Sequence, residues 1–215
     1  YGDESALKKA YMEFAKRAAV TVSLYKDLPF DFGRTFGFDK YSDYYAKNMK
    51  LINGAYSFEL YEDAKEEAFI SLAVYGRHNV LNALAAAATA RCAGIPFKFI
   101  KEGLASFSGV ERRFENIGEV NGARCVADYA HHPNEIRATV RTAQKLTDGR
   151  LFVVFQPHTY SRTKNLFDSF VKALSPLNNL LIYRTYAARE YFDDAGSALT
   201  LSQSVKKSHY GDKPE

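Results

Sequence analysis

The chain has 215 residues, of which 47% are hydrophobic, and carries a formal net charge of +4. That length suffices for one large or two small domains, each with its own hydrophobic core. Acidic and basic residues are interspersed, so the sequence lacks the dense basic stripe of a nucleic-acid-binding protein. No apolar run approaches the roughly 20 residues that span a bilayer. We therefore expect neither nucleic acid nor a membrane as a partner.

Cys92 and Cys125 lie inside apolar segments and lack the spacing of metal ligands. Reduced thiols are typical of the cytoplasm, where disulfides are rare, and the first residues do not have the pattern of a signal peptide. We therefore expect a cytoplasmic protein. Because the chain begins with Tyr1 rather than methionine, we also expect it to be part of a longer polypeptide.

Ser5 precedes a segment in which apolar residues have helical spacing. Serine is favoured as an N-cap, and the apolar residues that follow recur every three or four positions: Leu7, Ala10, Tyr11, Phe14 and Ala18. The sequence therefore predicts a helix capped by Ser5. A β-branched run at residues 20–24 predicts a short strand after it.

Residues 33–75 consist of short segments in which apolar and polar side chains alternate. Strands are predicted at residues 34–38, 44–52, 55–61 and 69–74. Asn53 and Gly54 separate the second strand from the third, and this dipeptide is the strongest short-range signal for a β-hairpin. An acidic cluster at residues 63–67 predicts the next turn. We expect an antiparallel meander that carries no catalytic groups.

Helical patterns follow at residues 76–93 and from Pro96 onwards. Asn79 and Asn82, with His78 before them, are three residues apart and therefore share one face of the first helical turn. Two carboxamides that both donate and accept hydrogen bonds suit the edge of a heterocyclic base. Asn79 alone could instead be an N-cap, but a cap does not explain the second asparagine.

The helical pattern breaks at residues 108–115, which include Arg112 and Arg113. Paired arginines in a linker are commonly solvated, although a planar guanidinium is also well shaped to bind phosphate. We place the domain boundary here, so residues 1–107 and residues 108–215 are expected to form two domains.

Strands and helices alternate in the second half. Strands are predicted at residues 124–128, 151–155 and 180–183, and helices at residues 136–146, 165–174 and 199–207. This alternation is typical of a parallel sheet with right-handed crossovers, so the expected fold class is α/β. The strand at residues 151–155 is apolar throughout, which predicts burial on both faces.

Polar loops follow these strands at their carboxyl ends, the edge at which open α/β sheets bind ligands. The first loop contains Asp128, Tyr129 and His131, the second contains His158 and Arg162, and the third comprises residues 184–190. The alternative for each loop is a polar connection that only caps the next helix and contacts water. Three such loops at one edge favour a ligand-binding site.

Four ordered segments resemble the Mur ligase family. They read Gly-Arg-His-Asn-Val-Leu-Asn-Ala-Leu from residue 76, Gly-Val-Glu-Arg-Arg-Phe-Glu from 109, Asp-Tyr-Ala-His-His-Pro-Asn-Glu-Ile from 128 and Phe-Gln-Pro-His-Thr-Tyr-Ser-Arg-Thr from 155. Mur ligases have a UDP-binding domain, a central ATPase domain and a Rossmann-like C-terminal domain. The resemblance implies the end of the central domain at residues 1–107 and most of the C-terminal domain at residues 108–215.

The resemblance also implies a nucleotide site. Asn79 and Asn82, with His78 before them, match asparagines that hold the adenine of ATP. Arg113 matches a linker arginine that approaches the nucleotide phosphates, and Asp128 matches an aspartate that contacts the ribose.

Four further positions match residues near the reacting groups. Tyr129 and His131 match residues that flank the nucleotide, and His158 and Arg162 match the loop that receives the amino acid. Asp128, His131, His158 and Arg162 are therefore the catalytic candidates.

These motifs are most similar to those of members that add L-alanine to UDP-N-acetylmuramate in peptidoglycan biosynthesis. The implied reaction is an ATP-dependent acid–amino-acid ligation in the bacterial cytoplasm, with Mg²⁺ as a cofactor. ATP phosphorylates the muramoyl carboxylate, and the amine of alanine attacks the acyl phosphate. Positive groups and positioning are expected to supply most of the catalysis. The oligomeric state is left open.

The chain departs from the family pattern in several places. It lacks the phosphate-loop motif G-x-x-x-x-G-K-[ST], so this loop and the Mg²⁺ ligands are expected mostly upstream of residue 1. Ala127 replaces one acid of the family's acidic pair, and Thr159 stands where some members have an arginine. The residues present are not expected to catalyse the reaction alone. A ligase that recycles murein tripeptide onto the same UDP-sugar, or a truncated non-catalytic nucleotide-binding paralogue, remain alternatives.

Overall fold

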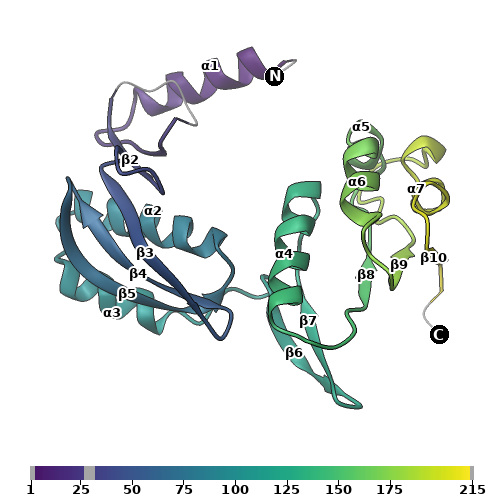
Figure 1. Cartoon of the computed structure of the whole chain (residues 1–215). Coiled ribbons are helices and arrows are strands. Elements are labelled where there is room, and N and C mark those ends of the chain that lie inside the picture. Colours follow the sequence, from purple (N-terminus) through teal and green to yellow (C-terminus); the bar gives the residue numbers. More distant parts are fainter. Residues whose placement is uncertain (1–2, 27–31, 214–215) are drawn as a thin grey trace. The chain divides into compact units, whose positions relative to one another are not determined.

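The computed structural model describes residues 3–26 and 32–213 of the chain. They form two compact units, and the division between the units falls after Gly109 (Figure 1). The first unit contains a mixed five-stranded sheet, and the second contains a three-stranded parallel sheet and a separate two-stranded sheet. This architecture confirms the α/β fold class.

The strands of the first unit have the same order in the sheet as in the chain. They are β1 (Val22–Leu24), β2 (Arg34–Gly37), β3 (Tyr44–Ile52), β4 (Ala55–Glu62) and β5 (Lys65–Tyr75). β3, β4 and β5 form the predicted antiparallel meander, but β1, β2 and β3 pair in parallel. The antiparallel prediction for residues 33–75 was wrong for β2, because alternation of apolar side chains indicates a strand but not the direction of its neighbour.

Asn53 and Gly54 form the predicted hairpin turn. They lie between Ile52, the last residue of β3, and Ala55, the first residue of β4, and have φ angles of 50° and 83°. Turns of two residues between antiparallel strands commonly need positive φ at both positions, which asparagine and glycine adopt at low cost. The turn sets the register of the two strands, in which Ile52 pairs with Ala55.

The helices of the first unit are α1 (Glu4–Ala15), α2 (His78–Cys92) and α3 (Phe97–Ser106) within the described residues. Asp3 caps α1, because its side chain accepts a hydrogen bond from the N–H of Ala6 at 2.7 Å. The prediction of a cap at Ser5 was wrong, since aspartate is an equally good N-cap, and Ala18 lies beyond the end of the helix. α2 and α3 pack against the sheet (Figure 1). The fully buried side chains of this core are Phe58, Leu60, Ile70, Val80, Leu84 and Ala87.

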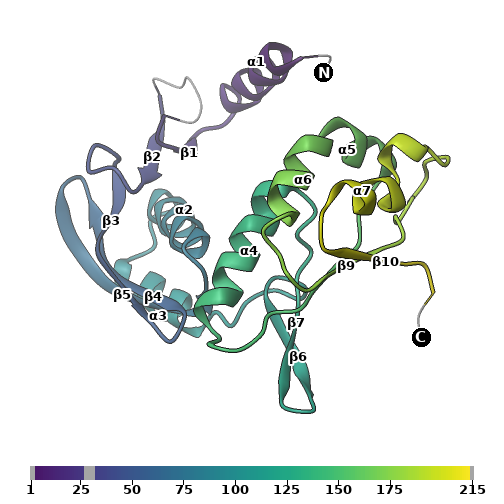
Figure 2. The same ribbon diagram turned by 45° about the vertical axis from the view of Figure 1, so that its right-hand side comes forward.

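The parallel sheet of the second unit has the order β10-β9-β8. Its strands are β8 (Val153–Phe155), β9 (Leu180–Tyr183) and β10 (Ser208–Gly211), and its helices are α4 (Pro133–Lys145), α5 (Tyr160–Asn165), α6 (Phe167–Leu174) and α7 (Ala198–Ser204), with a 3-10 helix at Asp194–Gly196. α6 contacts both α4 and α7 (Figure 2). The helix predicted at residues 165–174 is confirmed as α6. The sequence did not predict α5, which is separated from α6 by Leu166, whose φ and ψ of −114° and 20° are not helical.

The prediction for β7 (Ala123–Ala127) was wrong. β7 was predicted as the first strand of the parallel sheet, but it pairs antiparallel with β6 (Glu115–Val120) in a separate sheet. The sequence did not predict β6, because this strand is almost wholly exposed and has no alternating apolar face. Val154 in β8 is 70% exposed. The prediction that this strand is buried on both faces was therefore also wrong, and β8 lies at an edge of its sheet.

Leu174 on α6 provides a test of the core of the second unit. Its side chain is fully buried among Phe170, Ile182 and Leu201. Leu174→Ala should lower the free energy of unfolding by about 2–5 kcal/mol, because it removes buried methyl groups and leaves a cavity. Leu199 on α7 is 44% exposed, so the same change there should cost less than about 1 kcal/mol. Urea unfolding followed by circular dichroism measures both losses, and equal losses would contradict this packing.

Candidate active site

The two asparagines of the first unit lie on the first turn of α2. The N-cap of this helix is Arg77, so Asn79 is not the cap. The Nδ2 group of Asn79 donates to the carbonyl of Tyr75 at 2.7 Å, and the Nδ2 group of Asn82 donates to Oδ1 of Asn79 at 2.9 Å. The two residues therefore share a face, as predicted from their spacing. Within the described residues these bonds leave Oδ1 of Asn82, which is exposed, as an available acceptor.

Asp128 joins two segments of the second unit. One carboxylate oxygen accepts from the N–H of Phe114 at 3.0 Å, and the other accepts from the N–H of Ala130 at 2.7 Å. The guanidinium of Arg113, next to Phe114, lies 6.0 Å from the centre of the Tyr129 ring. The structure therefore brings together three of the predicted site residues: Arg113, Asp128 and Tyr129.

Glu135 holds the histidine pair after β7. Its Oε2 atom accepts from the N–H groups of His131 and His132 at 3.0 and 3.1 Å, and His132 caps α4. Pro133 is the first residue of α4, where its missing N–H is tolerated. Partial burial acts to raise the pKa of Glu135, but the two N–H groups and the neighbouring positive charges outweigh it and lower the pKa. The carboxylate is therefore ionised at neutral pH and fixes the backbone of both histidines.

The orientation of the His131 ring follows from one hydrogen bond. Its Nδ1 atom lies 2.8 Å from the carbonyl oxygen of Tyr129. A carbonyl only accepts, so Nδ1 carries the proton, and Nε2 is the acceptor of the neutral imidazole.

The side chain of Arg162 contacts His158, four residues earlier in the chain. Its Nη1 atom donates to the carbonyl of His158 at 2.5 Å and lies 3.2 Å from Nδ1 of the His158 ring. A guanidinium only donates, so Nδ1 of His158 is the acceptor, and its Nε2 carries the proton in the neutral ring. The two predicted residues of this loop are therefore paired. The ring nitrogens of His158 therefore have the opposite donor and acceptor arrangement to those of His131.

Four aromatic rings connect the three strand-end loops. The Tyr129 ring lies 4.9 Å from that of His131 and 6.1 Å from that of His158, and the His158 ring stacks on Tyr186 at 5.0 Å between ring centres. The loops after β7, β8 and β9 therefore meet, although β7 belongs to a separate sheet. Tyr129 and Tyr186 are 44% and 53% exposed, so this ring cluster is accessible to a ligand.

Tyr186 and Glu190 lie in the predicted strand-end loop at residues 184–190, but the sequence assigned neither of them a role. Tyr186 forms an isolated parallel bridge with His158, and Glu190 binds the first turn of α5. Their positions directly after a predicted strand were the available signal. Neither residue type is unusual in such a loop, so the sequence did not single them out.

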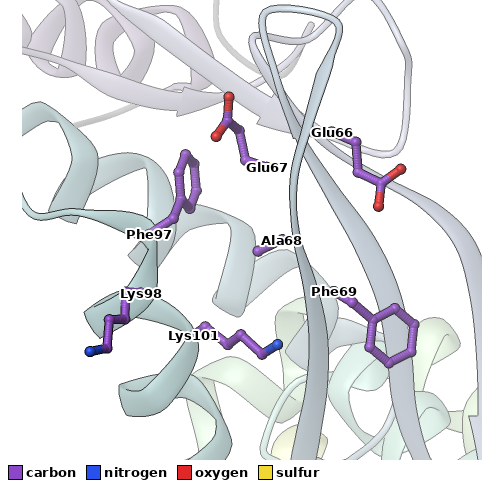
Figure 3. A pocket seen from close by; sticks show the side chains of 7 residues that line it. All are labelled: Glu66, Glu67, Ala68, Phe69, Phe97, Lys98 and Lys101. Atoms are coloured by element: carbon purple, nitrogen blue, oxygen red, sulfur yellow. The ribbon is translucent and has the colours of Figure 1, made fainter.

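A surface recess of about 330 Å³ lies in the first unit. It is formed by the beginning of β5 and the beginning of α3, where Glu67, Phe69, Phe97 and Lys101 contribute side chains (Figure 3). The side chain of Phe97 also packs against the core of the unit. The recess contains none of the residues that the sequence predicted for binding.

Within residues 3–26 and 32–213, no group of three or more histidine, cysteine, aspartate or glutamate side chains is placed to hold a metal ion. In the same residues, none of the helices combines the length and the apolar character needed to cross a membrane. Cys92 and Cys125 are both unbridged thiols.

Comparison with known proteins identifies both halves of the chain. Residues 19–90 match the Mur ligase middle domain, and residues 112–212 match the glutamate ligase domain of Mur ligases. The UDP-N-acetylmuramate–L-alanine ligase of Clostridium acetobutylicum is 43% identical over 175 residues, which are 81% of this chain and 38% of that protein. The enzyme of the same name from Desulfosudis oleivorans is 38% identical over 96% of this chain and 48% of its own length. The chain thus spans about two fifths to half of these relatives.

Solved structures give the same result. The UDP-N-acetylmuramate–alanine ligase of Thermotoga maritima superposes with a TM-score of 0.76 at 26% identity, over 99% of this chain and 47% of that one. A murein peptide ligase of Psychrobacter arcticus superposes with a TM-score of 0.58 at 24% identity, over 95% of this chain and 42% of that one, and shows the fold alone. The resemblance seen in the sequence motifs is confirmed: the chain belongs to the Mur ligase family and carries its middle and C-terminal domains.

Proposed function

We propose that the protein containing this chain joins L-alanine to the carboxylate of UDP-N-acetylmuramate at the expense of ATP, in the bacterial cytoplasm and as a step of peptidoglycan biosynthesis. The observation that carries the proposal is the meeting of Tyr129, His131 and His158 with the His158–Arg162 pair at the carboxyl ends of the strands. Cations and imidazoles gathered at such an edge suit the carboxylate of an amino acid and an acyl phosphate. The names of the curated relatives support the same reaction.

The first-unit residues are assigned to adenine. Oδ1 of Asn82 would accept from the exocyclic amine of the base, and Asn79 would hold Asn82 in place through the bond between their side chains. His78, the first residue of α2, adjoins this face. A carboxamide suits this role because it recognises a base edge without carrying charge.

Residues in the linker and in the loop after β7 are assigned to the sugar and phosphates of ATP. Arg113 would neutralise phosphate charge, and Tyr129 would pack beside the nucleotide. Each carboxylate oxygen of Asp128 already accepts one backbone N–H. Each oxygen keeps a second lone pair, so a ribose hydroxyl can still donate to it.

The loop after β8 is assigned to the amino acid. Arg162 would hold the carboxylate of L-alanine in two parallel hydrogen bonds, a geometry that the guanidinium supplies and an ammonium does not. The amine of alanine must lose a proton before it forms the amide bond, and Nε2 of His131 is the neutral acceptor near this loop. Nε2–H of His158 would donate to the oxygen that gains negative charge when the amine attacks.

In the proposed sequence the γ-phosphoryl group of ATP passes to the muramoyl carboxylate and ADP is released. The amine then attacks the acyl carbon, the amide bond forms, and inorganic phosphate leaves. Mg²⁺ is part of the proposal and would neutralise phosphate charge. We place its ligands outside residues 3–26 and 32–213, since the side chains described there do not form a metal site.

The reaction is tested by ADP release from the full-length protein supplied with ATP, Mg²⁺ and UDP-N-acetylmuramate. L-Alanine should support turnover, and the murein tripeptide should not. The structural likeness to a murein peptide ligase makes the tripeptide the necessary comparison. Preference for the tripeptide would replace the proposed substrate. ADP release that needs neither acceptor would refute ligation altogether.

Asn82→Ala should raise the KM for ATP, because the base would lose its hydrogen-bond acceptor. A buried polar group left without its partner costs about 1–3 kcal/mol, which corresponds to roughly a 5- to 150-fold loss of affinity. Thr89→Ala is the control, since Thr89 lies on the same helix and bonds to the carbonyl of Ala85. Steady-state kinetics measure both variants. If Asn82→Ala has the same ATP KM as the parent protein, the adenine assignment is wrong.

Arg162→Lys should raise the KM for L-alanine several-fold and leave the KM for ATP nearly constant. Lysine keeps the charge but loses the planar fork that can grip a carboxylate. Arg141→Lys is the matched control, because Arg141 is exposed on α4. An unchanged alanine KM in Arg162→Lys would remove this residue from the amino-acid site.

A further inference from the structure

The first turn of α5 takes its capping group from another part of the chain. Thr159 is the N-cap residue of α5, but its side chain makes no capping hydrogen bond. The N–H groups of a first turn have no partner within their own helix and need an acceptor elsewhere. Oε2 of Glu190 accepts from the N–H of Ser161 at 2.8 Å, and Oε1 accepts from the hydroxyl of the same serine. Glu190 lies 29 residues further along the chain.

These bonds keep Glu190 ionised. The hydroxyl of Ser161 contributes most, followed by its N–H, and together with the groups of Thr159 and Tyr160 they lower the pKa of Glu190 to about 2. The carboxylate therefore stays charged throughout the neutral range. A charged acceptor forms a stronger hydrogen bond than a neutral one.

Residues after Glu190 hold the same helix through three further contacts. Lys164 on α5 pairs with Asp193 at 3.0 Å, and the rings of Tyr160 and Phe192 lie 5.6 Å apart. Gly196 lies so close to α5 that a Cβ atom at this position would be 2.1 Å from the carbonyl oxygen of Tyr160. We call residues 190–196 the α5 clasp.

α5 carries the arginine that the proposed function assigns to L-alanine. Arg162 follows Ser161 directly, and its Nη1 atom returns to the carbonyl of His158. Ser161, which Glu190 binds, therefore lies in the sequence between His158 and Arg162, whose side chain returns to His158. A shift of the first turn of α5 would change the distance and direction from which Arg162 meets a ligand, and a displacement of about 1 Å can cost a large factor in rate.

We propose that Glu190 is a positioning residue for amino-acid recognition: its carboxylate fixes the first turn of α5 and thereby the direction of the Arg162 guanidinium. The inference rests on the proposed function and adds to it a residue that need not touch the substrate. It also explains how Thr159 can begin α5 without capping it. The capping function belongs to Glu190, which reaches this turn from the loop after β9.

Glu190→Gln in the full-length protein tests the inference. Glutamine keeps the size of the side chain but carries no charge, and its NH₂ group cannot accept the hydrogen bond that the second carboxylate oxygen accepts. The KM for L-alanine should rise roughly tenfold, the factor expected when a charge-assisted hydrogen bond is lost. The KM for ATP should stay within about twofold of its value in the parent protein. Asp194→Asn is the control, because it removes the same charge from the α5 clasp at a side chain that accepts from Thr200. The KM for L-alanine should not change in this variant.

A second readout separates positioning from general stability. Amide hydrogen exchange at residues 159–163 should be faster in Glu190→Gln than in Asp194→Asn. Ser161→Ala removes one of the two donors and should raise the alanine KM by a smaller factor. The double variant should be less than additive, because both changes remove the same contact.

The outcomes discriminate between the inference and the function on which it rests. A raised alanine KM in both Glu190→Gln and Arg162→Lys, with faster exchange in the former, supports the positioning role. If Arg162→Lys raises the alanine KM and Glu190→Gln does not, the inference is overturned and the proposed function stands, even if exchange at residues 159–163 becomes faster. If neither variant changes the alanine KM, both are overturned.

Discussion

Backbone N–H groups in the loops of the second unit depend on carboxylates for their hydrogen bonds. Glu135 accepts two of them after β7, Asp128 accepts one there and one from Phe114 before β6, and Glu190 accepts one at the start of α5. These loops have no sheet or helix partner for the same groups, and an unsatisfied N–H away from water is costly. Each carboxylate therefore determines where the loop runs and which side chains it presents. The arrangement of the proposed active site follows from these three acids.

Fixing the backbone leaves the side chains of the same loops available. The rings of Tyr129 and Tyr186 remain about half exposed, and the ring nitrogens of His131 and His158 are held with opposite donor and acceptor directions. A site that is held in place before the ligand arrives loses less entropy on binding and keeps its dipoles aimed at the developing charge.

The sequence predicted the parts of the molecule that depend on local chemistry. The Asn53–Gly54 turn and the shared face of Asn79 and Asn82 both rest on interactions within a few residues. The parts that depend on distant partners were not predicted. β6 and β10 contain few apolar residues, and the pairing of β7 with β6 rather than with β8 is decided by tertiary contacts. Glu190 could not be assigned either, since nothing near it in the sequence indicates that it caps a helix 29 residues earlier.

The central claim is that the loops after β7 and β8 receive the amino acid. NMR of the full-length protein, isotopically labelled at histidine, tests this claim directly. The imidazole signals are followed while L-alanine is added in the presence of UDP-N-acetylmuramate and a non-hydrolysable ATP analogue. Substitution of single histidines by glutamine assigns each signal. The signals of His131 and His158 should shift and saturate with L-alanine, while that of His209 on β10 should not move. Saturation of the protein with L-alanine without a shift at His131 or His158 would contradict the account.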